Sequence, residues 1–168
     1  LHLSRLDHDK LEVATIDLPV MLDELLKRYA PHKKRFDITT RKKATTLANE
    51  AAINELMGIL IDNAIKYSPE GSTIYIRVFE QRGRVGFEIK NSGKPIPEEI
   101  LPKLFERFYR ADTSRTNGSK NGYGLGLSIA KKIVDVHHGE LTVSSGEEAT
   151  TFIFYLPIVR KSSVKAQS

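Results

Sequence analysis

"NELMGILIDNAIKYSPEG", residues 54–71, is the stretch of sequence that decides the fold. Across residues 51–67, apolar side chains recur every three or four positions, which predicts an amphipathic helix with one face on a core. The core-facing residues are Ile53, Leu56, Met57, Leu60 and Ala64. A Pro-Glu-Gly sequence at positions 69–71 ends the helix.

The same helix carries a second, separate stripe. Its members are Glu55, Ile59, Asn63 and Lys66, spaced four, four and three residues apart. The Asn63 amide offers a neutral oxygen to a hard cation such as magnesium, which takes few protein ligands and completes its shell with phosphates and water. Lys66, one turn later, is placed to neutralise phosphate charge. The alternative is that both residues belong to a solvated helix face, and this helix taken alone favours that interpretation.

The segments before this helix predict strands and a further helix. Residues 12–17 are expected to form a short strand, and residues 18–29 a helix with Pro19 in its first turn. Residues 36–40 and 44–47 are expected to form a pair of strands. The first ten residues resemble the last turns of an amphipathic helix, because three leucines recur there.

The segments after this helix switch from a helical period to an alternating one. A hairpin is expected across the turn at residues 81–83, with Ile74, Ile76, Val78, Val85, Phe87 and Ile89 on one face. A short helix at 97–104 and a Ser/Thr/Asn/Gly-rich loop at 111–120 follow. Residues 125–138 predict a helix that ends at Gly139 as a left-handed cap, before strands at 140–144 and 150–156. The sum is a two-layer α/β (α+β) sandwich, in which a mixed, mostly antiparallel sheet packs on three helices.

Composition narrows the class of protein. A chain of 168 residues with 40% hydrophobic residues suits one domain with one core. The longest apolar run, residues 56–61, is far shorter than a membrane helix, so the fragment is expected to be soluble and to make no direct membrane contact. The net charge of +5 comes from scattered basic runs without an aromatic platform, which argues against nucleic-acid binding. The absence of cysteine excludes disulfides and thiol nucleophiles.

Three further motifs have the residue types of a phosphate or nucleotide site. "NSGKPIP", residues 91–97, follows a strand, but as a lone motif it is explained by turn chemistry. "LFERFYRAD", residues 104–112, places Arg107 and Arg110 at the root of the predicted loop, where guanidinium groups suit phosphate. Phe105 in that motif is better explained as a core residue than as a ligand contact.

The third motif is "NGYGLGLSIAKKIV", in which Gly122, Gly124 and Gly126 alternate just before a predicted helix. Glycines let backbone amides face an anion, and the N-terminus of a helix adds a favourable dipole. The pattern differs from a P-loop because no Gly-Lys-Ser/Thr follows at the required spacing. It differs from the dinucleotide fingerprint because Ile129 stands where a third glycine would fall.

Taken in order, "NELMGILIDNAIKYSPEG", "NSGKPIP", "LFERFYRADTSR" and "GYGLGLSIAKKIVDVHHGEL" resemble the N box, first glycine box, F box and second glycine box of sensor histidine kinases. The similarity extends from about residue 17 to residue 157. It implies the Bergerat ATP-binding fold, shared with gyrase, mismatch-repair ATPases and the large heat-shock chaperones. It also implies that residues 1–10 are the remnant of a dimerisation helix, residues 11–159 the ATP-binding catalytic domain and residues 160–168 a flexible tail.

The resemblance implies roles for individual residues. Asn63 matches the magnesium ligand, and Lys66 and Arg110 match the groups that assist phosphoryl transfer. Residues 111–123 match the lid over the nucleotide. The full set expected to contact ATP is Asn63, Lys66, Tyr67, Asn91, Gly93, Ile96, Phe105, Arg107, Arg110, Gly122, Tyr123, Gly124, Leu125, Gly126, Leu127 and Thr151.

The sequence departs from the family pattern at several positions. Asn91 replaces the usual adenine-reading aspartate, which removes the charge-assisted part of that hydrogen bond and predicts weaker nucleotide affinity. Ile59 stands where gyrase-type ATPases carry the glutamate that activates water, so efficient ATP hydrolysis is not expected. Pro95 and Ala149 stand where the family commonly has glycine.

The function implied by this resemblance is that of the catalytic domain of a two-component sensor histidine kinase, which uses ATP and Mg²⁺. The phosphoacceptor histidine is expected on a dimerisation domain that is missing here, because no histidine of this chain has the sequence context of an acceptor. A cognate response regulator, a homodimeric parent and a membrane anchor elsewhere in that parent are also implied, with this domain in the cytoplasm. The alternatives are a nucleotide-binding regulatory module without transfer activity and a gyrase-like ATPase.

Overall fold

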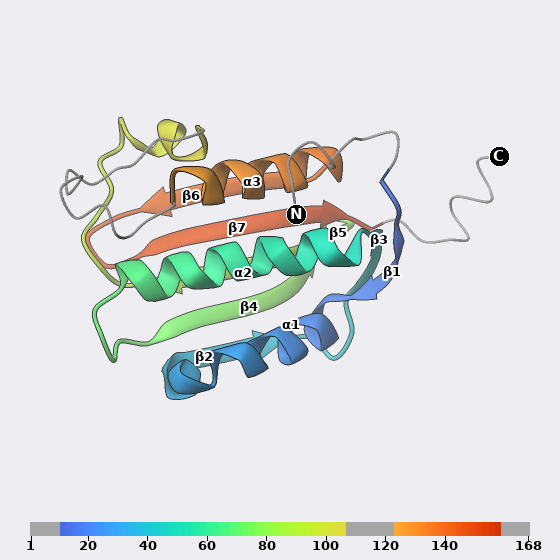
Figure 1. Cartoon of the computed structure of the whole chain (residues 1–168), viewed down its shortest axis with the longest axis horizontal. Helices are drawn as coiled ribbons and strands as arrows, with labels where there is room; N and C mark the ends of the chain where they lie inside the picture. Colours follow the sequence, from blue (N-terminus) through green and yellow to red (C-terminus); the bar gives the residue numbers. More distant parts are fainter. Residues whose placement is uncertain (1–10, 107–122, 159–168) are drawn as a thin grey trace.

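The computed structural model describes residues 11–106 and 123–158, which form two layers (Figure 1). A five-stranded sheet has the order β2-β4-β5-β7-β6, with β2 parallel to β4 and the other pairs antiparallel. The helices α1, α2 and α3 lie side by side on one face of this sheet. The predicted fold class is confirmed. The proposed remnant at residues 1–10 and the tail at 160–168 lie outside the described residues.

The segment that precedes the central helix contains β1 (Ala14–Asp17), α1 (Leu18–Leu26), the 3-10 segment η3 (Lys27–Arg35), β2 (Phe36–Thr40) and β3 (Thr45–Ala48). The predicted helix at 18–29 is therefore shorter than expected. The prediction that the strands at 36–40 and 44–47 pair with each other is wrong: β3 pairs with β1, while β2 joins the main sheet beside β4. The segment between β2 and β3 connects two different sheets. Strand propensity alone does not predict which sheet a strand joins.

The central helix α2 (Glu50–Tyr67) begins at Asn49, whose side-chain oxygen accepts a hydrogen bond from the Ala52 amide. One side of α2 is inaccessible to water along its whole length. The buried residues are Ala52, Ile53, Leu56, Met57, Leu60, Ile61 and Ala64. At about 25 cal/mol per Å² of apolar surface, this burial is a principal source of stability, and it fixes which stripe of α2 stays accessible.

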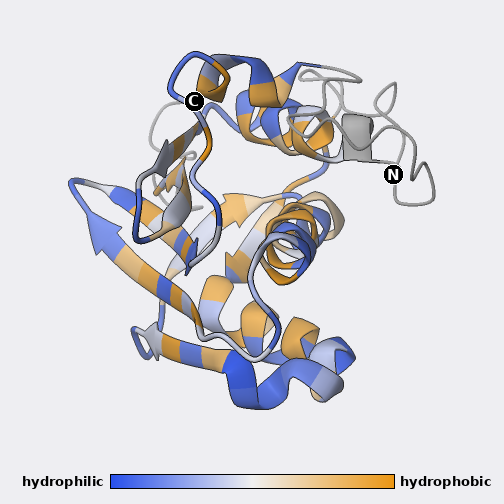
Figure 2. Ribbon diagram, turned by 90° about the vertical axis from the view of Figure 1, so that its left-hand side faces the viewer, coloured by the Kyte–Doolittle hydropathy of each residue, from blue (hydrophilic) through white to orange (hydrophobic). Residues whose placement is uncertain are grey.

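The hairpin of β4 (Ile74–Gln81) and β5 (Arg84–Asn91) turns at Arg82 and Gly83, which both have positive φ. Along these strands and along β7 (Thr150–Pro157), buried and accessible residues alternate, as the orange and blue bands in Figure 2 show. The buried set packs against the helices. β6 (Glu140–Ser145) completes the edge of the sheet.

The other face of the sheet carries aromatic rings paired with cations. The Arg77 guanidinium lies 4.1 Å from the centre of the Phe79 ring, and the Arg84 guanidinium lies 4.0 Å from the centre of the Tyr155 ring. The Phe79 and Tyr155 rings meet edge to face at 5.9 Å. Phe79 also lies over Gly86, where a side chain would overlap its ring. The face that bears no helix is thus covered by its own side chains.

Helix α3 (Tyr123–Val136) follows the short 3-10 segment η4 (Leu101–Phe105). At the C-terminal end of α3, the Gly139 amide donates to the Val134 carbonyl and the His138 amide donates to the Asp135 carbonyl. This is a Schellman motif, whose left-handed residue is His138 with φ 57°. The prediction that Gly139 is the left-handed cap is therefore wrong by one position. Gly139 is required for a different reason, because a Cβ there would overlap the Tyr155 carbonyl oxygen.

His137 connects the end of α3 to the beginning of α2. Its Nε2 accepts a hydrogen bond from the Asn49 amide at 3.0 Å, so Nδ1 carries the proton and donates to the Ile133 carbonyl at 2.7 Å. The ring is buried, with 8% of its surface exposed. Burial lowers the pKa of His137, and nearby His138 acts in the same direction, whereas the Ile133 hydrogen bond opposes the shift. The folded state therefore favours the neutral imidazole.

None of the helices within residues 11–106 and 123–158 combines the length and the apolar character that a membrane span requires.

Replacing His138 with glycine is expected to stabilise the protein by about 1 kcal/mol, because glycine adopts the left-handed conformation without steric cost. Replacing Gly139 with alanine is expected to destabilise it by about 2 kcal/mol, because the added methyl group overlaps the backbone of β7. Urea denaturation of both variants measures the two effects. Equal behaviour of the two substitutions would contradict the assigned helix end.

The stability of the protein is expected to fall as the pH drops below about 6.5, the ordinary pKa of histidine. In that range the unfolded chain binds a proton at His137 while the folded protein, with its lowered pKa, resists binding one. Denaturation midpoints at about pH 7.5 and about pH 5.5 measure this loss. The His137→Gln variant cannot titrate and should lose less stability between these conditions. An equal loss in both proteins would show that His137 does not contribute.

Candidate functional site

Four element ends meet at one end of the molecule. The C-terminal end of α2 leads directly into β4, and the first residue of β4, Ile74, pairs with Asn91 at the end of β5. Asn91 in turn pairs with Thr150, the first residue of β7. Because α3 runs antiparallel to α2, the N-terminus of α3 also points toward this end (Figure 1). The polar residues singled out in the sequence are therefore brought together by topology.

The polar stripe of α2 lies along the side that faces α3. Ile59 approaches Gly126 in the first turn of α3, with its Cγ2 atom 3.7 Å from where a Cβ of residue 126 would lie. Asn63 is one turn further along the same stripe and is half-buried. Within the described residues, no side chain is hydrogen-bonded to its amide. Its oxygen is thus available to a ligand that enters beside the N-terminus of α3.

Lys66 and Tyr67 end the helix. The Lys66 ammonium lies 5.2 Å from the centre of the Tyr67 ring, and 46% of the Tyr67 side chain is exposed. An exposed aromatic face next to a cation suits a ligand that combines a flat ring with negative charge. Lys66 ends the stripe that contains Asn63, and contact of Lys66 and Tyr67 with a nucleotide stays a prediction.

Asn91 is 5% exposed, and its side-chain amide nitrogen donates to the Ser92 carbonyl at 2.8 Å. This hydrogen bond sets the orientation of the side chain, because the opposite orientation would place two oxygens against each other. The Asn91 side-chain oxygen is thereby left as the acceptor. It can accept a hydrogen bond from an amino group such as that of adenine.

Gly93 is held against the end of α2. Its φ is 149°, and a Cβ at this position would lie 2.6 Å from the Tyr67 carbonyl oxygen. Only glycine permits both the backbone conformation and this close approach. The contact joins the segment that contains Asn91 to the helix that contains Asn63, so the two halves of the candidate site are directly packed together.

The rest of the 91–97 segment is anchored to the β6–β7 hairpin. The Ile96 amide donates to the Ser145 hydroxyl at 2.9 Å, and the Ser145 and Thr150 hydroxyls are hydrogen-bonded at 2.7 Å. Ser145 was not identified from the sequence. Thr151, which was predicted to lie near the adenine, lies on the opposite face of β7 from Asn91, whereas Thr150 lies on the same face and beside it. The period of two along β7 could have identified Thr150, since the buried Phe152 shares its face.

The second glycine motif is described only in part. Tyr123, Gly124 and Leu125 belong to the backbone of α3, so the helix begins two residues before the predicted start and Tyr123 is not part of a loop. Leu127 is half-buried and packs against the core. Arg107, Arg110, Gly122 and residues 111–122 of the lid proposed at 111–123 lie outside the described residues. The N-terminus of α3 can supply backbone amides and a positive dipole to an anion.

Phe105 packs on the core as the sequence indicates. Its ring meets the Phe152 ring edge to face, with centroids 6.4 Å apart. The contact fixes η4 against β7. A direct contact between Phe105 and a ligand stays a prediction.

The donor set at this end of the molecule is neutral or cationic. Among the described residues, no group of three or more His, Asp or Glu side chains could hold a metal ion by itself. A site built from Asn63, Lys66 and a helix N-terminus therefore fits a polyanion, and it fits a magnesium ion that takes most of its ligands from phosphates and water.

The sequence from the start of α2 to the end of β7 matches a known family. Residues 48–160, more than half of the chain, match the model of the "Histidine kinase-, DNA gyrase B-, and HSP90-like ATPase" family. The chain belongs to this family. The matched range begins just before α2 and includes all four motifs, so the predicted resemblance is confirmed.

Individual relatives narrow the family to its kinase branch. The chain is 46% identical over 102 residues to the probable sensor kinase SilS of Salmonella typhimurium, which covers 61% of this chain but 20% of SilS. It resembles the nucleotide-free catalytic domain of the histidine kinase ThkA with a TM-score of 0.75 and 29% identity, covering 88% of this chain and 96% of that one. A structure of ThkA with the response regulator TrrA also matches, with a TM-score of 0.73 and 26% identity, covering 89% of this chain and 42% of that one. The chain thus has the fold and sequence of a histidine kinase ATP-binding catalytic domain and spans about a fifth of the length of SilS.

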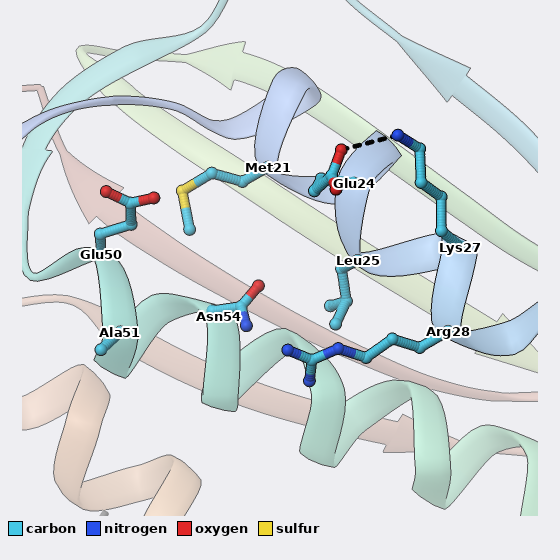
Figure 3. A pocket seen from close by; sticks show the side chains of 8 residues that line it. All are labelled: Met21, Glu24, Leu25, Lys27, Arg28, Glu50, Ala51 and Asn54. Carbon is cyan, nitrogen blue, oxygen red and sulfur yellow. Dashed lines mark hydrogen bonds and ion pairs between the residues drawn. The ribbon is translucent and has the colours of Figure 1, made fainter.

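A separate hollow of about 630 Å³ lies between α1 and the first turns of α2 (Figure 3). In Figure 3, Glu50 lies toward one end of the hollow and Arg28 toward the other, with Asn54 between them. Its lining contains none of the stripe residues of α2, so it is distinct from the candidate nucleotide site. The Glu24 carboxylate on its rim is paired with Lys27 at 2.9 Å.

Replacing Asn91 with aspartate is expected to destabilise the unliganded protein by about 1 kcal/mol or more, because a buried carboxylate would face the Ser92 carbonyl. The same variant should gain more stability from bound ADP than the unsubstituted chain does, since a carboxylate accepts a stronger hydrogen bond from the adenine amino group. Thermal unfolding with and without ADP measures both effects. An unchanged midpoint without nucleotide would contradict the described orientation of Asn91.

Proposed function

We propose that this chain is the catalytic domain of a two-component sensor histidine kinase, which binds Mg-ATP and transfers the γ-phosphoryl group to a histidine on the parent's dimerisation domain. The contact between Gly93 and the Tyr67 carbonyl is the observation that carries the proposal. It brings the base-reading Asn91 and the stripe of Asn63 and Lys66 to the two sides of one site. ATP needs a hydrogen-bond acceptor for its adenine amino group next to groups that bind its phosphates and magnesium.

In the proposed site, Asn91 accepts a hydrogen bond from the adenine amino group and Tyr67 covers the base. Thr150, which pairs with Asn91, lies near the base in place of Thr151. Gly93 and Ile96 shape the base pocket through their backbone positions. The N-terminus of α3, from Tyr123 to Leu127, faces the phosphates with its amides.

The transfer step requires charge stabilisation and little else. An imidazole nitrogen of the acceptor histidine attacks the γ-phosphorus, and the bond to the β–γ bridging oxygen breaks as ADP leaves with the electron pair. Lys66 neutralises charge on the phosphates, and Asn63 holds magnesium through its amide oxygen. Magnesium, when bound, offsets the negative charge of the triphosphate. Arg107, Arg110 and Gly122 are proposed to complete the phosphate contacts.

The stripe residue Ile59 favours transfer over hydrolysis. It is aliphatic and packs toward Gly126, where a gyrase-type ATPase carries a glutamate that activates water. A site without that base leaves water unactivated while an imidazole nucleophile needs no activation. A gyrase-like ATPase is therefore not favoured. The similarity to sensor kinases argues against a transfer-inactive module.

Partners follow from the kinase assignment. The phosphoacceptor lies on the parent's dimerisation domain, which makes the parent a homodimer. A cognate response regulator receives the phosphoryl group from that histidine, and the match to ThkA with its response regulator supports such a partner. The parent is anchored in the membrane, and this domain is in the cytoplasm.

The decisive experiment mixes the purified chain with the dimerisation domain of the same kinase and γ-labelled ATP. Label is expected on the dimerisation domain, and Asn63→Ala is expected to reduce its rate of appearance by about a hundredfold or more. Asn54→Ala is the matched control, because Asn54 lies on the same helix but lines the separate hollow. Nucleotide binding without label on histidine would favour the regulatory module, and steady phosphate release from the chain alone would favour the ATPase.

A further inference from the structure

Arg35 is the most heavily hydrogen-bonded cation among the described residues, and its hydrogen bonds go to the turn that follows α2. Its Nε donates to the Ser72 carbonyl at 2.8 Å. Its Nη2 lies within hydrogen-bond distance of the Ser68 hydroxyl, the Pro69 carbonyl at 3.1 Å and the Ser72 hydroxyl at 3.2 Å. The planar guanidinium thus connects both ends of a five-residue turn.

A side-chain hydrogen bond between this turn and the helix, from the Ser68 hydroxyl to the Ile65 carbonyl, is long at 3.4 Å. Ser68, the cap residue of α2, is extended with φ −102° and ψ 151°, so no left-handed residue closes the helix end. Inside the turn, the Ser72 amide and hydroxyl both bond to the Pro69 carbonyl. Because Arg35 belongs to η3, its hydrogen bonds connect the turn at residues 68–72 to η3.

The turn begins one residue after Tyr67. The Tyr67 carbonyl is the group against which Gly93 is packed, with no room for even a methyl group between them. A displacement of the turn therefore moves the Tyr67 ring and the 91–97 segment together. The phosphate side of the site, at Asn63, is one helical turn away and is held by the buried face of α2.

We propose that Arg35 is a positioning residue for the base-binding wall formed by Tyr67 and Gly93. It acts through the turn at residues 68–72 and does not touch the nucleotide. The proposal rests on the proposed function, because it assigns the adenine to this wall. It predicts that loss of Arg35 weakens recognition of the base more than recognition of the phosphates.

Tyr29 provides a structural comparison from the same η3 segment. Its hydroxyl donates to the Asp62 carboxylate at 2.8 Å and also approaches the Gly58 carbonyl at 3.4 Å. Tyr29 thus holds the middle of α2, away from the turn. Tyr29→Phe removes an anchor of η3 on α2 without disturbing the turn, so it separates loss of stability from loss of positioning.

The test measures dissociation constants for ADP and for inosine diphosphate, which carries an oxo group where adenine has its amino group. The unsubstituted chain is expected to prefer ADP. Arg35→Gln is expected to weaken ADP binding by about tenfold and to reduce the preference for ADP over inosine diphosphate. Arg35→Lys keeps the charge but not the planar set of donors, so its preference for ADP should lie between those of the unsubstituted chain and Arg35→Gln. Tyr29→Phe should lower the unfolding midpoint and leave the preference unchanged.

An unchanged preference in both Arg35 variants would overturn the proposal, even if both were less stable. Should Arg35→Gln fail to fold, the lysine variant decides by the same ratio. Failure of the unsubstituted chain to bind ADP would overturn the proposed function, and this inference with it.

Discussion

The structure depends on the burial of α2 against the sheet. Seven of its side chains are buried, and at a turn of 100° per residue this fixes the direction of every other residue of the helix, including the stripe that faces α3. That stripe contains Asn63 and Lys66. Packing of the hydrophobic core therefore determines where the ligand-facing residues point, and the site needs no loop to orient its central amide. Shifting α2 by one residue, so that Asn63 takes the buried position of Ala64, would also move Ile61 to the exposed position of Asp62.

Much of this arrangement could be predicted from the sequence, because it follows from local periods. The central helix, the hairpin after it and the last two strands appear within a few residues of their predicted positions. The errors occur where partners are distant in sequence. The short strands β2 and β3 have the same local pattern whether they pair with each other or with β4 and β1. Thr151 was predicted from a family motif alone, and the strand period places it on the face of β7 opposite to Asn91.

Asn91 shows how a departure from a family pattern acquires meaning in the structure. From sequence alone, the exchange of aspartate for asparagine only weakens one hydrogen bond. In the structure, the amide also donates to the Ser92 carbonyl, which an ionised carboxylate cannot do. The asparagine thus holds the segment in shape before any ligand arrives. Serine and threonine hydroxyls at the start of β7 and the end of β6 extend this support to Ile96, so this part of the candidate site is organised by neutral hydrogen bonds.

The uncovered face of the sheet bears on how such a domain behaves inside a larger protein. Its two central rings are each matched by an arginine, and those arginines also pair with Glu88 and Glu140. The stacked guanidinium groups are hydrated and cover aromatic rings that would otherwise expose apolar surface. Each of the two arginines therefore gives its ring a charged, hydrated cover, so this face of the sheet presents ion pairs where bare aromatic surface would otherwise lie.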